Sequence, residues 1–423
     1  MLALGIDLGT SGVRSAVVDG AGAPVAQARA PHPAQPDPDR IDAALWWTAV
    51  AACLDAQVAA LARAGHDPAA ITAIAVDGTS GSMVLTDQDL RPVSRALMYN
   101  SKGFDTEAAQ IARHAPSVHI AQGSNSALGR AMRLASEAGP GARHLLHQAD
   151  FIAAKLIGWG GASDVNNALK TGVDPATGAW PAWVAQVIDP TLLPQAHGIG
   201  DDLGPIDQRV ARRFGLSPGA RVRAGTTDSI AAFLASAPAL DPGVAVTSLG
   251  STLAIKMLSP EPVNDPTLGL YAHRLRDLWL VGGASNTGGA VLAAHFSVDD
   301  IARLSDRIDP DLPTGLDYYP LIQPGERFPV NDPTLPPRLT PRPADDATFL
   351  QGLFEGIAAI EARAYQAVAA RGGPTPTVLL SAGGGATNPV FTRIRARALG
   401  MMPVTPTQTE AAIGTAKLAA GLV

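Results

Sequence analysis

The sequence predicts an α/β protein of two domains, and three observations support this class. The chain has 423 residues, whereas a single hydrophobic core stops growing at roughly 250–300 residues. Short apolar segments of strand type alternate with segments of helical period, which is typical of mixed sheets covered by helices. A glycine hairpin near the N-terminus recurs in the second half, which indicates that the two halves share a fold.

The first half begins with a predicted meander of three strands joined by glycine turns. These strands are expected at residues 2–8, 13–18 and 23–29. The period of the apolar residues then predicts a helix over 41–64, in which Trp46 and Trp47 are expected to pack against the sheet. The following expected elements are strands at 71–76 and 83–86, a helix at 150–157, a strand at 222–224 and a helix at 229–235.

A Pro/Gly-rich stretch at residues 237–243 predicts the domain boundary. We therefore expect an N-terminal domain of residues 1–237 and a C-terminal domain of residues 238–423. The second half should contain strands at 244–249 and 253–258, a proline-rich surface loop at 318–343 and a helix at 349–369. A strand at 378–381 and a last helix at 411–420 complete it. Asn388 suits an N-cap and Pro389 the first helical position.

Composition and charge exclude several classes of function. The net charge is −6 and the basic residues form no stripe, so we expect no nucleic acid partner. There is no run of about 18 uninterrupted apolar residues, so we expect no membrane. The N-terminal segment has no basic leader and carries an acid at Asp7, unlike a secretory signal. Cys53 is the only cysteine. A cytoplasmic enzyme with a buried structural thiol is therefore expected.

The two glycine hairpins are candidate phosphate-binding turns. The first contains Thr10, Ser11 and Gly12, and the second contains Gly250, Ser251 and Thr252. A glycine turn lets backbone N–H groups approach a polyanion closely, and hydroxyl groups add further donors. One such hairpin usually only turns the chain, but one in each half predicts that a triphosphate is held from both sides.

Asp7 lies beside the first hairpin, whereas the second copy has Ser248 at the matching position. A carboxylate next to a phosphate-binding turn requires a cation between them, because two anions repel. Mg²⁺ held by one carboxylate together with phosphates is the usual arrangement. The sequence therefore predicts Mg²⁺ at Asp7, and predicts that the second copy binds phosphate without metal chemistry. The alternative is an ordinary acid at the end of a strand.

Asp228 lies at a predicted junction between a strand and a helix. The helix N-terminus stabilises the ionised carboxylate, which can then accept a proton at neutral pH. In phosphoryl transfer such a base need not be strong, because positioning dominates. The alternative is that Asp228 only caps the helix.

Two further patterns bear on nucleotide and metal binding. Gly383-Gly384-Gly385 precedes a predicted helix and would let a flat adenine or a phosphate lie close to the backbone. The chain contains neither the dinucleotide pattern G-x-G-x-x-G at this place nor a P-loop. His144 and His147 lie three residues apart but lack further ligands nearby, so we do not expect a metal there.

With these patterns in order, the sequence resembles the FGGY carbohydrate kinases of the actin-like ATPase superfamily. The resemblance covers nearly the whole chain. It rests on GIDLGTSGVRSAVVD, AVDGTSGSMVLTD, RALMYN, DFIAAKLIG, SDVNNALKTGVDPATGAWP, AGTTDSIAAF, VTSLGSTLAIK, GGASNTGGAVL, PGERFPVNDP, LLSAGGGATNPVF and EAAIGTAKLAAG. It implies two actin-like, ribonuclease H-like domains around a deep interdomain cleft. The N-terminal domain would carry most of the sugar site and the C-terminal domain most of the ATP site.

The resemblance also implies roles for individual residues. Asp7 would orient Mg²⁺, and Asp228 matches the catalytic base of the family. ATP would be bound by two hairpins, by an adenosine motif and by a segment flanking the nucleotide. Residues implied for these contacts are Thr10, Ser11, Gly12, Gly250, Ser251, Thr252, Asn286, Thr287, Gly288, Gly383, Gly384 and Asn388.

Within the family, the chain looks most like the pentulose kinases, and the resemblance favours D-ribulose before D-xylulose. Relatives often have Tyr-Asn-Asp where this chain has Tyr99-Asn100-Ser101, and that Asp helps to bind the sugar in many members. The departure leaves the exact sugar open. The expected sugar contacts are Asp7, Asp77, Ser80, Asn100 and Asp228.

Other readings remain at this stage. A chaperone-type or cytoskeletal ATPase of the same superfamily would need a peptide-binding domain or would form filaments. A non-catalytic sugar-binding regulator on a kinase fold is a further alternative. A monomer or a homodimer is expected.

Overall fold

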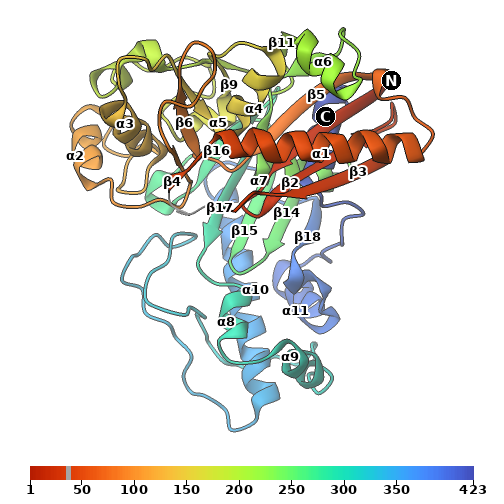
Figure 1. Cartoon of the computed structure of the whole chain (residues 1–423). Helices are drawn as coiled ribbons and strands as arrows, with labels where there is room; N and C mark the ends of the chain where they lie inside the picture. Colours follow the sequence, from red (N-terminus) through yellow and green to blue (C-terminus); the bar gives the residue numbers. More distant parts are fainter. Residues whose placement is uncertain (35–39) are drawn as a thin grey trace. The chain divides into compact units, whose positions relative to one another are not determined.

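A computed structural model describes residues 1–34 and 40–423, and the chain forms two compact units (Figure 1). Unit 1 contains Met1–Ala235, Arg274–Arg276 and Gln408–Val423. Unit 2 contains Ser236–His273 and Asp277–Thr407. Each unit is built around a mixed sheet, as the sequence predicts.

The main sheet of unit 1 has seven strands in the order β11-β12-β5-β1-β2-β3, with β13 paired to β5. β1 is antiparallel to β2 and parallel to β5. The strands are β1 (Leu2–Leu8), β2 (Gly12–Val18), β3 (Pro24–Pro31), β5 (Ile71–Gly78), β11 (Asp202–Pro205), β12 (Arg221–Arg223) and β13 (Thr226–Thr227).

The two faces of this sheet are covered by different helices, because alternate residues of a strand point to opposite faces. Leu4 and Ile6 belong to a core shared with α1 (Ala44–Arg63) and α4 (Gln148–Ile157). Ala3 belongs to a second core of small residues against α12 (Ala411–Ala420). Gly5 lies on that second face. A Cβ there would stand 2.1 Å from the carbonyl oxygen of Ala412, so only glycine allows this approach.

Smaller elements complete unit 1. The strands β4, β7, β6 and β8 form a four-stranded sheet in that order, and β10 pairs with β9. The remaining elements are β4 (Arg40–Ile41), β6 (Met83–Thr86), β7 (Ala96–Leu97), α2 (Asp105–His114), α3 (Ala127–Glu137), β8 (His144–His147), β9 (Ala162–Asp164), α5 (Val165–Leu169), β10 (Gln195–His197), α6 (Gln208–Phe214) and α7 (Asp228–Ser236).

Unit 2 has a five-stranded sheet in the order β16-β17-β15-β14-β18, and the long helix α10 packs into its core. The elements are β14 (Val244–Leu249), β15 (Leu253–Ser259), β16 (Tyr271–Leu275), β17 (Leu278–Ser285), α8 (Gly289–Ala293), α9 (Val298–Ser305), α10 (Asp346–Ala369), β18 (Val378–Ala382) and α11 (Pro389–Leu399).

The internal repeat predicted from the hairpins extends to whole sheets. In unit 1 the order β5-β1-β2-β3 combines a parallel pair with two antiparallel pairs. In unit 2 the order β18-β14-β15-β17 has the same directions. Asp7 is buried near the end of β1, whereas Ser248, its counterpart near the end of β14, is exposed. The two sheets thus have the same topology but differ at this position, which is Asp7 in unit 1 and Ser248 in unit 2.

The chain does not divide between the units at a single boundary. Unit 1 ends its first segment at Ala235, two residues before the expected boundary, but Gln408–Val423 also belongs to unit 1. The reason is the small-residue face of β1, which α12 covers. The expected second domain of residues 238–423 therefore differs from unit 2 in its last segment and at Arg274–Arg276.

Helix α1 is the one helix of the described residues that is long and apolar enough to cross a membrane. Figure 1 shows it lying along β2 and β3, and the buried side chains of Trp46, Val50 and Cys53 belong to the core of unit 1. Trp46 also meets Phe151 edge to face at 6.1 Å. These contacts are those of a core helix, as the sequence analysis expects for Trp46 and for Cys53.

Candidate active site

Three carboxyl groups of unit 1 come from neighbouring segments of its main sheet. Asp7 on β1 pairs in register with Asp77 on β5, and Asp77 pairs on its other side with Thr226 on β13. Helix α7 then begins at Asp228, two residues after Thr226. Asp77 is fully buried, Asp7 is buried, and Asp228 is half-buried.

The environment of this group disfavours negative charge. Burial raises the pKa of Asp77 well above the ordinary value, and the charges of Asp7 and Asp228 raise it further. Burial also raises the pKa of Asp7, with a contribution from Asp228, while Arg14 opposes the rise. The Arg14 guanidinium lies 3.5 Å from Asp7 and is itself half exposed. The site therefore has an excess of acidic groups over cations.

Local structure fixes the backbone at Asp228. The two-residue strand β13 aligns Thr226 and Thr227 with Asp77 and Gly78. The Asp228 carboxylate accepts a hydrogen bond of 2.6 Å from the backbone N–H of Ser229 at the start of α7. Both this bond and the helix N-terminus favour the ionised carboxylate.

The first predicted phosphate-binding turn joins β1 to β2. Gly9 N–H donates to the carbonyl of Gly12 at 3.0 Å, and a ring nitrogen of His32 lies 2.9 Å from the carbonyl oxygen of Gly9. Thr10 and Ser11 are exposed at the tip of the turn, whereas Gly12 is buried. The turn thus presents the hydroxyl side chains of Thr10 and Ser11 three and four residues after Asp7.

The loop after β5 contains Ser80, whose hydroxyl oxygen is buried without a hydrogen-bond partner among the described residues. Its neighbour Thr79 is anchored to Gln148 at the start of α4, with distances of 3.0 Å from the backbone N–H and 2.7 Å from the hydroxyl to Gln148 Oε1. Ser82 in turn accepts a 2.9 Å bond from the N–H of Tyr99. These bonds connect the two expected sugar-binding loops, 77–82 and 98–101.

Asn100 is exposed and lines a cavity of about 400 Å³ together with Ser101 and Lys102. The Ser101 hydroxyl accepts a 3.1 Å bond from the N–H of Met98.

Below this loop lies the buried guanidinium of Arg130. Within residues 1–34 and 40–423 it donates to the backbone carbonyls of Gly81, Ser101 and Asn125, and it forms no ion pair with a carboxylate.

In unit 2, the second predicted turn is bonded to the start of α8. Gly250 N–H donates to the Thr252 carbonyl at 3.2 Å. The carbonyls of Gly250 and Ser251 accept bonds of 2.9 and 3.0 Å from the N–H groups of Gly289 and Ala290. Gly250, Ser251 and Thr252 are exposed. The turn is therefore held rigidly from its carbonyl side.

A cavity of about 1120 Å³ opens beside this turn, within unit 2. Of the residues expected to bind ATP, Gly250, Ser251, Gly384 and Asn388 line it. Thr252, Asn286, Gly288 and Gly383 do not appear in its lining. The rest of the wall is mostly apolar and includes Leu292, Ala293, Phe296, Ile301, Ala302, Phe354 and Val390.

Two of the expected nucleotide residues have structural partners. Asn388 caps α11, since its Oδ1 accepts from Phe391 N–H at 3.0 Å and its amide donates to Ser305 at 2.8 Å. Asn286 is held by the expected proline-rich loop, which contains no helix or strand. Its backbone N–H donates to Glu326 at 2.6 Å and its side-chain amide to the Gly325 carbonyl at 2.9 Å.

The residues present suit a divalent cation and a nucleotide. A buried Asp7 beside another buried carboxyl, with one exposed arginine for compensation, fits a divalent cation. No group of three or more His, Cys, Asp or Glu side chains that could hold a metal occurs in residues 1–34 and 40–423. A largely apolar cavity bordered by glycine turns fits a nucleotide base and its phosphates.

Sequence reasoning gave no role to Gln148 or Arg130, although each anchors an expected sugar-binding loop. It also did not expect the Thr415 hydroxyl of α12, which donates to Asp77. Gln148 lies just before the segment DFIAAKLIG, and Thr415 lies in EAAIGTAKLAAG. These family segments could have pointed to the two residues, but they do not show that Gln148 contacts Thr79 or that Thr415 contacts Asp77. His147, weighed as a metal ligand, is buried and contacts Asp150 and Thr171 instead.

Repeated sheets of this topology, with Asp7 at the first hairpin and Asp228 at a strand–helix junction, are typical of actin-like kinases. Comparisons with family models assign the chain directly. The N-terminal domain model of the FGGY family of carbohydrate kinases matches residues 2–131, and the C-terminal domain model matches residues 245–422. The chain belongs to the FGGY family of carbohydrate kinases, which are ATP- and Mg²⁺-dependent enzymes acting on small sugars.

Individual relatives agree with this assignment. A xylulose kinase from Streptomyces coelicolor is 28% identical, over 100% of this chain and 88% of that protein. Among solved structures, a gluconate kinase from Lactobacillus acidophilus is similar with a TM-score of 0.84 at 17% identity, covering 100% of this chain and 90% of that one. A xylulose kinase from Rhodospirillum rubrum has a TM-score of 0.83 at 22% identity, covering 99% and 89%. At these identities the structures establish the fold.

Proposed function

We propose that the chain transfers the γ-phosphoryl group of ATP to the terminal hydroxyl of a ketopentose, with Asp228 as the base. The observation that supports this proposal is the set of three carboxyl groups at β1, β5 and the start of α7. Two of them have raised pKa values because of burial, whereas Asp228 is half-buried at a helix N-terminus. The different environments suit different roles, with Asp7 and Asp77 near a bound cation and Asp228 as the proton acceptor.

In this proposal Asp228 accepts the proton of the sugar hydroxyl as the oxygen attacks phosphorus. The bond between the γ-phosphorus and the bridging oxygen of ADP breaks, and ADP leaves with that oxygen. The base contributes mainly by orienting the hydroxyl, because the transition state for phosphoryl transfer is loose.

Asp7 would hold Mg²⁺, which neutralises charge on the phosphate oxygens when bound. Thr10, Ser11 and Gly12 would donate to phosphate oxygens in unit 1, and Gly250, Ser251 and Thr252 would do so in unit 2. The apolar cavity of unit 2 would take the adenosine, with Gly384 and Asn388 in its wall. Asn286, Thr287, Gly288 and Gly383 would support this part of the site.

The sugar would contact Asp77, Ser80 and Asn100 in addition to Asp7 and Asp228. Two ketopentoses remain as candidates. D-ribulose is favoured by the resemblance of the GTSG and ALMYN segments to the small D-ribulose kinases among the pentulose kinases. D-xylulose is supported by the xylulose kinase from Streptomyces coelicolor, which is similar over the whole chain. Discrimination between such epimers can depend on one hydrogen bond, so the two sugars must be compared directly.

The test is ADP release with Mg-ATP and a panel of D-ribulose, D-xylulose, pentitols, hexuloses, gluconate and glycerol, ranked by kcat/KM. We expect a ketopentose to rank first, with the phosphate on its terminal hydroxyl by NMR of the product. The proposal is wrong if a hexulose, gluconate or glycerol exceeds both ketopentoses by about tenfold or more. Light scattering with ATP separates a filament-forming ATPase from a monomeric or homodimeric cytoplasmic kinase.

A non-catalytic sugar-binding regulator is the second candidate. It would bind a ketopentose without releasing ADP at any enzyme concentration. The presence of both Asp7 and Asp228 favours the active kinase, because a regulator has no need for a carboxylate at either place.

A further inference from the structure

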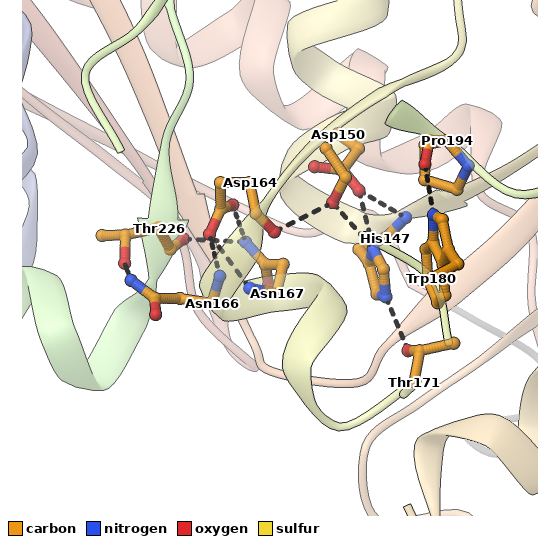
Figure 2. A network of polar contacts seen from close by, with 10 residues as sticks. His147, Asp150, Asp164, Asn166, Asn167, Thr171, Trp180, Pro194 and Thr226 are labelled. Carbon is orange, nitrogen blue, oxygen red and sulfur yellow. Dashed lines mark hydrogen bonds and ion pairs between the residues drawn. The ribbon is translucent and has the colours of Figure 1, made fainter. Parts of the chain in front are cut away.

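The start of α7 is supported by a buried polar network that reaches it through β13 (Figure 2). Asp164 caps α5, and its Oδ1 accepts bonds of 2.9 and 3.0 Å from the N–H groups of Asn166 and Asn167. The Asn167 side-chain amide then donates to two oxygens at once. It lies 2.6 Å from Asp164 Oδ2 and 3.1 Å from the backbone carbonyl of Thr226.

This bridge ends two residues before Asp228. Thr226 belongs to a strand of only two residues, and α7 begins directly after it. A strand this short has few ladder hydrogen bonds, so its position depends on other contacts. Asn166 adds a second support, because its amide lies 3.5 Å from the Thr226 hydroxyl and 2.9 Å from the Arg274 carbonyl.

The orientation of the Asn167 side chain leaves one of its polar atoms unpaired, which is energetically unfavourable. Asn167 is completely buried, and its Oδ1 has no hydrogen-bond partner among the described residues. A buried amide would ordinarily satisfy its oxygen as well, since an unpaired acceptor is unfavourable. Here both acceptors, Asp164 Oδ2 and Thr226 O, require the nitrogen on the same side. The amide therefore keeps its hydrogen bond to the Thr226 carbonyl although its own oxygen stays without a donor among the described residues.

A second group of residues holds Asp164 in turn. His147 lies 2.7 Å from Asp150 and 2.9 Å from Thr171 through its two ring nitrogens. The hydroxyl of Ser163, the neighbour of Asp164 on β9, lies 3.3 Å from His147. Figure 2 shows these side chains on the far side of Asp164 from Thr226. The chain of contacts thus runs from α4 through β9 and α5 to β13.

We propose that Asn167, carried by Asp164, is a positioning residue that sets the backbone of β13 and thereby aims Asp228 at the sugar hydroxyl. This inference rests on the proposed role of Asp228 as the base. Asn167 acts on the backbone carbonyl before the catalytic residue and has no assigned contact with substrate. Phosphoryl transfer is sensitive to such support, because a small misplacement of the reacting groups slows it strongly.

The test compares Asn167→Ala and Asn167→Asp with a control. Asn167→Asp keeps the size of the side chain and, when ionised, cannot donate to Thr226. Gln57→Met is the control, because Gln57 is an equally buried amide that contacts Ser15 on β2 and not β13. Two readouts are measured for each folded variant: steady-state kinetics, and hydrogen exchange of the peptide that covers residues 226–230.

For both Asn167 variants we expect kcat to fall about 10- to 100-fold, with KM for ATP and for the sugar changed by less than about threefold. Exchange at 226–230 should be faster by about tenfold or more, since the carbonyl support of β13 is lost. Gln57→Met should lower thermal stability without either effect. A kcat within about twofold of wild type, or unchanged exchange at 226–230, overturns the positioning role.

Failure of this inference and failure of the proposed function are distinguishable. If the wild-type protein phosphorylates no sugar of the panel, the proposed function fails. The exchange measurement still decides whether Asn167 holds β13. If the wild type is active and the Asn167 variants keep both kcat and exchange, only the positioning role is wrong.

Discussion

Asp7 on β1 and Asp77 on β5 occupy paired positions of two parallel strands, and both carboxyl groups are buried. Burial raises the pKa of both groups, and the charge of Asp7 raises the pKa of Asp77 further. A fold gains no stability from this arrangement. It is the kind of local conflict expected where a protein binds a cation or reacts with a substrate.

Replacing Asp7 by Asn should therefore change stability and activity in opposite directions. The free energy of unfolding should rise by about 1–2 kcal/mol at pH 7, because a neutral amide removes the cost of burying the Asp7 charge. Turnover should fall by about 10²-fold or more, with a higher Mg²⁺ concentration needed for half-maximal rate. Urea unfolding and Mg²⁺ titrations measure the two effects. An unaltered Mg²⁺ response would remove Asp7 from the metal site.

Asp164 should make stability depend on pH. Burial, with the charge of Asp150, raises its pKa from 3.8 to about 7. Between these values the folded state binds the proton more tightly than the unfolded state, so stability falls as pH rises. The contribution of Asp164 to this slope is up to about 1.4 kcal/mol per pH unit, ending near pH 7. Asp164→Asn should lose that part of the slope in urea unfolding at pH 5, 6 and 7. Identical slopes in both proteins would contradict the raised pKa.

Gly383 and Gly384 form a matched pair beside the cavity of unit 2. Gly383 has φ of +91°, and a Cβ there would lie 2.6 Å from the Leu249 carbonyl oxygen. Gly383→Ala should therefore destabilise the protein by about 1–3 kcal/mol. A Cβ on Gly384 meets nothing within 4 Å. Gly384→Ala should keep stability within about 0.5 kcal/mol but weaken nucleotide binding. Equal Tm values for the two variants would contradict the strained position of Gly383.

A carboxylate at position 101 would test whether the buried charge of Arg130 lacks a counter-ion. Among the described residues the buried Arg130 guanidinium has no carboxylate partner, and burial lowers the pKa of Arg130 to about 10. Its Nη1 lies 3.4 Å from the Ser101 carbonyl oxygen, so a carboxylate on this residue would be close. Ser101→Asp should raise Tm by several degrees, since it supplies the missing anion. A lower Tm would show that the carbonyls alone satisfy Arg130.

The sequence allowed the hairpins, the acid of the first copy and the strand–helix junction at Asp228 to be predicted, because each is local. Residues within one turn, such as Gly250 and Ser251, lie together whatever the rest of the chain does. The repeat also follows from local pattern, since β1–β2 and β14–β15 have matching turns. The family models and the sheet topology confirm the two-domain kinase fold.

What could not be predicted depends on contacts between distant segments. Thr415 reaches Asp77 across 338 positions of sequence, and Asn167 reaches Thr226 across 59. The residues next to Thr415 and Asn167 in the sequence give no indication of these partners. The return of α12 to unit 1 has the same origin, because it follows from the small residues of β1 and β5. Asn388 and Asn286 were predicted from the family pattern, and their contacts with Ser305 and Glu326 came only from the fold.

The most direct test of the kinase account is the turnover of Asp228→Asn with Mg-ATP and the best ketopentose of the panel. The account predicts that kcat falls by about 10²- to 10⁴-fold, while ATP binding measured by calorimetry is unchanged and the protein stays folded. Full turnover in this variant would contradict the assignment of Asp228 as the base.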